Sequence, residues 1–128
     1  MPTTPTIWQE QFIANTVTDS TQTQPQILGL AGGNFLIAWT DYNDTVAPQT
    51  GSDIVGQLFD PVGNPIGDPI VLNAGYGDVR NEQDVSLAAT ADGGFVIAYE
   101  YAEGGDDDLR FRRFDADGEV TQSRTIVG

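Results

Sequence analysis

The sequence contains no cysteine and no histidine, and its five basic residues are all arginine, with no lysine. Without cysteine there are no disulfides or thiol nucleophiles, and without histidine there is no Ser-His-Asp triad. Zinc and haem sites built on these two residue types are excluded as well. Carboxylate and carbonyl oxygens therefore remain as the ligands for a metal ion, and calcium prefers such ligands.

Positive charge and long apolar runs are also scarce. Nineteen acidic residues face five basic ones, which gives a formal net charge of −14. Such a chain repels nucleic-acid phosphates and anionic lipids, so the sequence predicts no nucleic-acid partner. No stretch approaches the roughly 20 apolar residues that span a bilayer, which predicts no membrane insertion. Residues 1–8 have neither a basic region nor an apolar core, so no Sec-type signal peptide is recognised there.

Short apolar or alternating runs recur along the chain, whereas helical periodicity is nearly absent. The 128 residues, 39% of them apolar, are enough for one domain or two small repeats with a core. Gly-rich clusters separate the runs, and Gly-Gly and Asp-Gly pairs suit the positive φ of hairpin turns. The sequence therefore predicts an all-β fold. The expected strands are Phe12–Asn15, Ile27–Leu30, Phe35–Thr40, Ile54–Phe59, Ile70–Leu72, Val85–Ala89, Phe95–Tyr101, Leu109–Phe114 and Thr125–Val127.

The chain also resembles itself. Gly33–Trp39 aligns with Gly93–Tyr99 at an offset of 60 residues, and Ile54–Asp60 aligns with Leu109–Asp115 at an offset of 55. We expect a lead-in over residues 1–11, repeats over 12–68 and 69–124, and the first strand of a third repeat over 125–128.

Each expected unit has four short strands in meander order, which is the make-up of a β-propeller blade. A β-sandwich of eight or nine strands is the alternative. Propellers need roughly 4–8 blades, so two units predict either neighbouring repeats of a longer chain or self-association.

Two segments carry a family resemblance. Ala91–Tyr99 and Arg113–Gly118 resemble the tandem ADGGFVVxW and RFDADG units of large secreted bacterial surface proteins, described as hemolysin-type calcium-binding or RTX-adhesin-like. Phe12–Thr16 and Gln57–Gly63 are weaker matches, and Leu58 stands where the pattern has arginine. The resemblance implies an extracellular or cell-surface, non-catalytic repeat module. The calcium-binding nonapeptide Gly-Gly-x-Gly-x-Asp of that class does not occur in this sequence.

Acidic residues between the last two strands of each repeat predict a calcium site. Calcium takes six to eight oxygen ligands and suits a flexible, glycine-containing loop. Carboxylates crowded in one loop repel one another, and a cation would relieve that repulsion. The alternative is a solvated acidic loop, partly neutralised by nearby arginines. The candidate ligands are Glu103, Asp106, Asp107 and Asp108 in the second repeat, and Asp41 and Asp44 in the first.

Aromatic residues give the alternative function, in which exposed rings bind carbohydrate. Trp39 and Tyr99 share one position of the repeat and end apolar strands, which predicts packing in the core or at its rim. The candidate sugar-facing residues are Tyr42, Tyr101 and Trp8.

The Asp115–Gly118 segment has the look of a shortened calcium loop, but it predicts a hairpin turn in which Asp115 forms an Asx-type hydrogen bond. No carboxylate pair stands in a setting that would raise a pKa in an apolar cleft, so the sequence predicts no enzyme.

Together these observations predict a non-enzymatic extracellular repeat module with a structural or adhesive role and with calcium as the candidate ion. A lectin-like propeller module that binds cell-surface glycans is the alternative. A plain spacer without a ligand is the third hypothesis.

Overall fold

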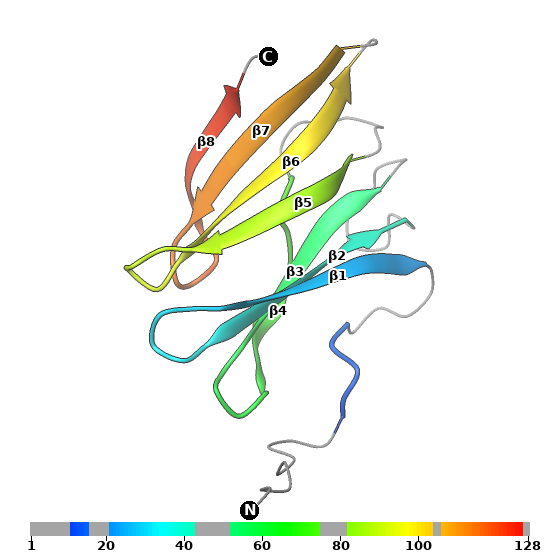
Figure 1. The fold of residues 1–128 in the computed structure, drawn as a ribbon. Helices are drawn as coiled ribbons and strands as arrows, with labels where there is room; N and C mark the ends of the chain where they lie inside the picture. Colours follow the sequence, from blue (N-terminus) through cyan, green and yellow to red (C-terminus); the bar gives the residue numbers. More distant parts are fainter. Residues whose placement is uncertain (1–10, 16–20, 43–51, 75–81, 104–105, 127–128) are drawn as a thin grey trace, which may run out of the picture.

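The computed structural model describes residues 11–15, 21–42, 52–74, 82–103 and 106–126, apart from the side chains of 82–84, 101–107 and 125–126. These residues form eight β-strands and no helix, in two four-stranded antiparallel sheets (Figure 1). The all-β prediction is therefore confirmed. Within the described residues, no helix has the length and apolar character needed to cross a membrane.

Each sheet is a simple meander in which every strand pairs with its neighbours in sequence. The first sheet contains β1 (Gln22–Gly29), β2 (Phe35–Asp41), β3 (Asp53–Phe59) and β4 (Pro65–Val71). The second sheet contains β5 (Glu82–Ala89), β6 (Phe95–Glu103), β7 (Asp106–Phe114) and β8 (Val120–Ile126).

The grouping of strands differs from the expected repeats by one strand. Phe12–Asn15, expected as a strand, has no strand conformation. Ile70 and Val71, expected to open the second repeat, end β4 and complete the first sheet, while Ile126 ends β8 and completes the second. The reason is local, because a tight turn after β3 and after β7 returns the chain directly to pair with the strand just left.

The turn after β7 shows how these hairpins close. The backbone N–H of Gly118 donates to the carbonyl oxygen of Asp115 over 3.1 Å, and Asp115 N donates to Glu119 O over 2.9 Å. Asp115 Oδ1 also accepts from the N–H of Asp117 at 3.0 Å. Gly118 has a φ of 85°, which glycine adopts without strain. The predicted hairpin turn with an Asx-type hydrogen bond is confirmed.

Each sheet has two faces, since directly opposed residues of paired strands share a face and the side chains alternate along a strand. We call one the Phe face and the other the Ala face. The Phe faces consist of Phe35, Ile37, Trp39, Val55, Gln57 and Phe59 in the first sheet, and of Phe95, Ile97, Tyr99, Arg110, Arg112 and Phe114 in the second. The Ala faces consist of Leu36, Ala38, Thr40, Ile54, Gly56 and Leu58 in the first sheet, and of Val96, Ala98, Glu100, Leu109, Phe111 and Arg113 in the second.

The hydrophobic core lies between the two sheets and joins unlike faces. Its members come from the Ala face of the first sheet and from the Phe face of the second. Three further members lie after β1, after β4 and within β5. They are Leu36, Ala38, Ile54, Leu58, Phe95, Ile97, Tyr99, Phe114, Leu30, Leu72 and Val85. Each large side chain fully buried in this way stabilises the fold by about 1.5–3 kcal/mol.

The two sheets are therefore stacked head to tail. Trp39, Val55 and Phe59, on the Phe face of the first sheet, are buried outside this core. A two-fold arrangement would bring the same face of both sheets together, whereas here the Ala face of one meets the Phe face of the next.

Candidate functional site

The contact between the sheets is held by polar bridges at the margin of the apolar core. Arg112 of β7 is 6% exposed. Its Nη1 donates over 3.1 Å to the carbonyl oxygen of Leu72, the residue that follows β4. Gln26 of β1 donates from Nε2 to the carbonyl oxygen of Val85 in β5. These bonds fix the offset of one sheet on the other, because backbone carbonyls accept only in set directions.

The turn after β7 packs against the first sheet without space for another atom. A Cβ at Gly118 would lie 2.4 Å from Cδ1 of Ile70 and 3.5 Å from Cδ1 of Leu58. A Cβ at Gly93, in the turn between β5 and β6, would lie 3.5 Å from the carbonyl oxygen of Ala31. Turns of the second sheet therefore touch the first sheet and its turn.

The Ala face of the second sheet is open, although the same face of the first sheet is covered. Leu36, Ala38 and Ile54 are fully buried in the first sheet. Their counterparts Val96 and Ala98 are half-buried, and Leu109 is 50% exposed. Apolar side chains on an open face of a sheet indicate a surface available for contact.

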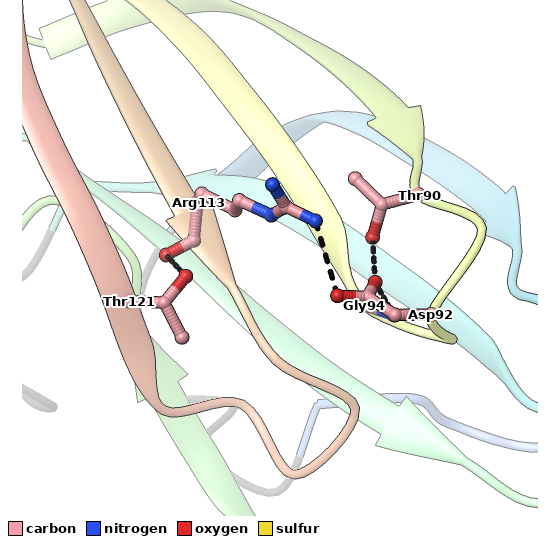
Figure 2. Close-up of polar contacts among 5 residues, drawn as sticks. All are labelled: Thr90, Asp92, Gly94, Arg113 and Thr121. Atoms are coloured by element: carbon pink, nitrogen blue, oxygen red, sulfur yellow. Dashed lines mark hydrogen bonds and ion pairs between the residues drawn. The ribbon is translucent and has the colours of Figure 1, made fainter.

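Arg113 lies on this open face and pairs with a turn residue. Its guanidinium Nη2 is 3.0 Å from Oδ2 of Asp92, and Figure 2 shows the side chain reaching from β7 towards the β5–β6 turn. Thr121 of β8 donates from Oγ1 to the backbone carbonyl of Arg113 at 3.3 Å. Both members of the ion pair are well exposed, so the pair adds little stability and serves to orient the arginine.

The pKa of Asp92 lies below its usual value of 3.8. The largest cause is the hydrogen bond that the Thr90 hydroxyl donates to Oδ1, followed by the backbone N–H of Gly94 and the charge of Arg113 (Figure 2). The pKa of Asp60 is lowered in the same way, first by the backbone N–H of Asn64. Each carboxylate is thus engaged within its own turn.

Segment 11–15 lies against the Phe face of the first sheet. The ring centroid of Phe12 is 5.5 Å from that of Phe59, and Phe59 stacks on Phe35 at 5.2 Å. The equivalent pair in the second sheet, Phe95 and Phe114, stacks at 4.7 Å and is covered by the first sheet. Phe12 therefore covers one phenylalanine pair, and a whole sheet covers the other.

A hollow of about 120 Å³ opens between segment 11–15 and the first sheet. The residues that line it are Ala14, Asn15, Gln22, Thr23, Pro25, Ile37 and Trp39. Asn15 donates from Nδ2 to Oε1 of Gln22 at 3.2 Å. The indole Nε1 of Trp39 is buried and has no hydrogen-bond partner among the residues that the structure describes. The hollow is thus mostly apolar, with amide groups at its margin.

Two acidic residues of the first sheet lie opposite each other at the ends of β2 and β3. Asp41 pairs with Asp53 across the strands, and both are buried. Asn73 donates from Nδ2 to Oδ1 of Asp53 at 3.0 Å and accepts at Oδ1 from the backbone N–H of Ile54 at 3.0 Å. Asp41, a predicted calcium ligand, therefore lies beside Asp53, whose carboxylate is engaged in the fold.

The acidic segment of the second sheet is not the loop that we expected. β6 extends to Glu103 and β7 begins at Asp106, so these two residues oppose each other across the hairpin, and Asp108 opposes Tyr101. The strands continue because cross-strand pairing with β6 satisfies the backbone of residues 106–108. Asp107 opposes Ala102. The side chains of Glu103, Asp106 and Asp107 lie outside the described part.

In the described part of the chain, no three acidic, histidine or cysteine side chains gather as a metal site. Asp44, the remaining predicted calcium ligand, lies outside the described residues. Calcium binding by the predicted ligands stays a prediction.

The aromatic residues are distributed largely as expected. Trp39 is 5% exposed and Tyr99 is 1% exposed, which confirms that both pack inside the fold. Tyr42 is 46% exposed at the end of β2. Trp8 and the side chain of Tyr101 lie outside the described part of the structure.

Three polar residues that anchor the fold were not singled out from the sequence. The arginines near the acidic segment were expected only to neutralise it, Asn73 lay just after an expected strand, and Gln57 lay inside one. Gln57 is 1% exposed and donates from Nε2 to the carbonyls of Leu58, Ile66 and Gly67 within 3.0–3.2 Å. A polar residue in the middle of an apolar run was the available signal, because such a residue needs a buried partner.

A scan against models of known protein families, a search of curated proteins and a search of solved structures found no match to this chain.

Proposed function

We propose that this chain is a non-enzymatic structural repeat module whose four-stranded sheets stack head to tail as the blades of a β-propeller do. The observation that carries this proposal is the shared core between the Ala face of one sheet and the Phe face of the next. Blades of a propeller repeat one such contact around a ring, so each blade must offer two complementary faces.

The internal repeat supports the same proposal. Phe35 stacks on Phe59 in the first sheet as Phe95 stacks on Phe114 in the second. The pairing of β1 with β2 and that of β5 with β6 also shift register at equivalent residues. Nearest-neighbour packing of equivalent units is the principle of repeat proteins, in which each added unit stabilises the one before it.

The test is a tandem chain in which residues 1–128 are followed directly by residues 12–128. The connection then has nearly the length of residues 72–81, which join β4 to β5. We expect one cooperative thermal transition with a melting temperature raised by about 3 °C or more, because a new sheet-to-sheet contact forms. Independent unfolding at the melting temperature of the single chain would count against the proposal.

A matched pair of tandem variants locates the gain. Leu109→Glu in the first copy places a charge at the new junction and is expected to remove the gain. The same substitution in the second copy leaves the new junction unchanged and is expected to keep the gain that this junction gives, including where it prevents the four sheets from closing into a ring. Equal effects of the two variants would mean that the junction does not use these faces.

The extracellular setting and the use of calcium belong to this proposal through the resemblance to secreted surface proteins. The use of calcium is supported by the acidic strand ends at Asp41 and Asp53 and at Glu103 and Asp106, where a cation would lower the repulsion between carboxylates.

Carbohydrate binding is the second candidate function. It is favoured by the hollow beside Trp39, since sugar sites combine an apolar surface with amide and hydroxyl groups such as those of Asn15 and Thr23. A glycan array would test it. Hits that disappear in Asn15→Ala and in Tyr42→Ala would support a lectin, and an empty array would remove this candidate.

A further inference from the structure

The chain leaves two complementary faces without a second sheet. The Ala face of the second sheet is open, and the Phe face of the first sheet is covered by segment 11–15 instead of by a sheet. We propose that a second copy of this chain docks between them, so that the Ala face of the second sheet in one copy packs on the Phe face of the first sheet in the next. This inference rests on the proposed function, because it extends the same head-to-tail contact to separate chains.

The internal contact supplies the template for this interface. Along β2 and β6, the Ala face keeps its apolar character, with Val96 and Ala98 at the positions of Leu36 and Ala38. Leu109 stands at the position of Ile54. Three positions of the open face therefore repeat the surface that the Phe face of the second sheet covers, whereas Glu100 and Arg113 place charge at the positions of the buried Thr40 and Leu58.

The differences between the two faces compensate in size only in part. Within the chain, Gly56 lies close to Leu72, since a Cβ there would be 3.0 Å from Leu72 Cδ1, and Arg112 also contacts Leu72. At the proposed interface, Phe111 replaces Gly56 and Gln57 replaces Arg112. The exchange of arginine for glutamine offsets only part of the volume that phenylalanine adds, so the second copy is expected to lie farther from the sheet beside Phe111 than the internal contact does.

Segment 11–15 competes with the second copy for the same surface. Phe12 is 42% exposed and packs its ring on Phe59, at the position where the first sheet covers Phe114 in the second sheet. Ile13, the next residue, is 76% exposed and makes no comparable contribution. The segment is thus a cap that the incoming sheet must displace, and association is expected to be weak in the unmodified chain.

Head-to-tail contact between copies extends until a ring closes. With two sheets in each chain, a ring of roughly 4–8 sheets contains about two to four copies. Each copy carries a net charge of −14, so the copies repel one another at low ionic strength. Added salt screens this repulsion and is expected to favour association.

The experiment is sedimentation equilibrium of the full chain over a range of concentrations, at low and at high salt. We expect Phe12→Ala to lower the dissociation constant about tenfold or more, because the cap is weakened. Ile13→Ala is the matched control and is expected to leave the dissociation constant unchanged. Phe12→Leu, which keeps an apolar side chain, serves in its place if circular dichroism shows that Phe12→Ala is unfolded.

A second pair of variants tests the other face. Leu109→Glu is expected to leave the chain a monomer at every concentration, alone and combined with Phe12→Ala. Val62→Glu is the control, since Val62 is 57% exposed in the turn between β3 and β4. Val62 stands at the position of the exposed Asp117, so the internal contact already accommodates a carboxylate there.

Two results would overturn the docking proposal. One is a Phe12→Ala chain that stays monomeric at the highest concentration, and the other is association that survives Leu109→Glu. If the tandem chain still gains stability at its junction, such a result rejects only docking between separate copies. If the tandem chain gains nothing either, the proposed function fails with it.

Discussion

Arg112 reaches from the second sheet to the first, where its Nη1 donates to the carbonyl oxygen of Leu72 over 3.1 Å. Leu72 itself is fully buried in the core between the sheets. The Arg112 side chain is thus hydrogen-bonded to the backbone of a residue whose own side chain lies in the apolar core. The counterpart of Arg112 in the first sheet is Gln57, which bonds within its own sheet.

Arg112→Ala is expected to destabilise the chain by about 3 kcal/mol, because a buried charged hydrogen bond and its packing are lost. Arg124→Ala, at an exposed position of β8, is the control and should change the free energy of unfolding by less than about 0.5 kcal/mol. Urea denaturation measures both values. Similar losses for the two variants would show that the bridge does not hold the sheets together.

Gly118→Ala is expected to cost more than Gly32→Ala. Both glycines have a positive φ, at 85° and 94°, so both substitutions carry a backbone penalty of about 1 kcal/mol. Only at Gly118 does the new Cβ meet another side chain, that of Ile70 in the first sheet. Because Cδ1 is the end of the flexible Ile70 side chain and can move aside, overpacking adds about 1 kcal/mol there, the low end of its range. In the double variant Gly118→Ala/Ile70→Ala, part of this extra loss of stability should disappear. If the losses of the two single variants simply add, Gly118 and Ile70 are not in contact.

Asn73→Asp and Asn73→Ala are expected to differ in their dependence on pH. Asn73→Ala leaves the N–H of Ile54 without its acceptor and should cost about 2 kcal/mol at pH 7. Asn73→Asp places a second carboxyl beside Asp53, and burial and like charge raise the pKa of the introduced group.

The sign follows from the raised pKa. The unfolded chain loses this proton near pH 3.9 but the folded chain holds it to higher pH, so the penalty is largest at neutral pH and shrinks as pH falls. Chemical denaturation of Asn73→Asp and Asn73→Ala from pH 7 to pH 4 measures the difference between them. A constant difference would mean that Asp53 does not repel the introduced carboxyl.

Thr90→Ala is expected to raise the pKa of Asp92 more than Arg113→Ala does, because the Thr90 hydroxyl is the largest cause of the lowered value. A carboxyl whose pKa is lowered by folding stabilises the fold above the unfolded pKa, and this contribution is lost as pH falls through the folded value. NMR titration of the Asp92 carboxyl carbon measures the pKa in each variant and shows which substitution raises it more. A larger effect of Arg113→Ala would make the ion pair the main cause.

Calcium is expected to raise the melting temperature more than magnesium does at matched ionic strength, if the acidic strand ends bind it. The measurement is thermal unfolding with calcium, with magnesium and with a chelator. Asp106→Asn with Asp108→Asn should remove the calcium effect, whereas Asp117→Asn, in the turn after β7, should not. Equal shifts from both cations would indicate screening of the net charge of −14.

The all-β class, the hairpin turns and the internal repeat were predictable from the sequence because they depend on local patterns. Glycine and aspartate at the turns, and apolar runs such as Phe35–Trp39 and Phe95–Tyr99, act within a few residues. The strands β4 and β8 were misplaced because their sequences alternate weakly and they are fixed by pairing with β3 and β7.

What the tertiary structure decided is which face meets which. Phe95 and Phe35 stand at equivalent positions of the repeat, yet Phe95 lies under a neighbouring sheet, whereas Phe35 stacks on Phe59, which Phe12 contacts. A period of two divides residues between faces but does not say what covers each face. That choice depends on contacts between residues far apart in sequence, such as Arg112 with Leu72, which exist only once both sheets are formed.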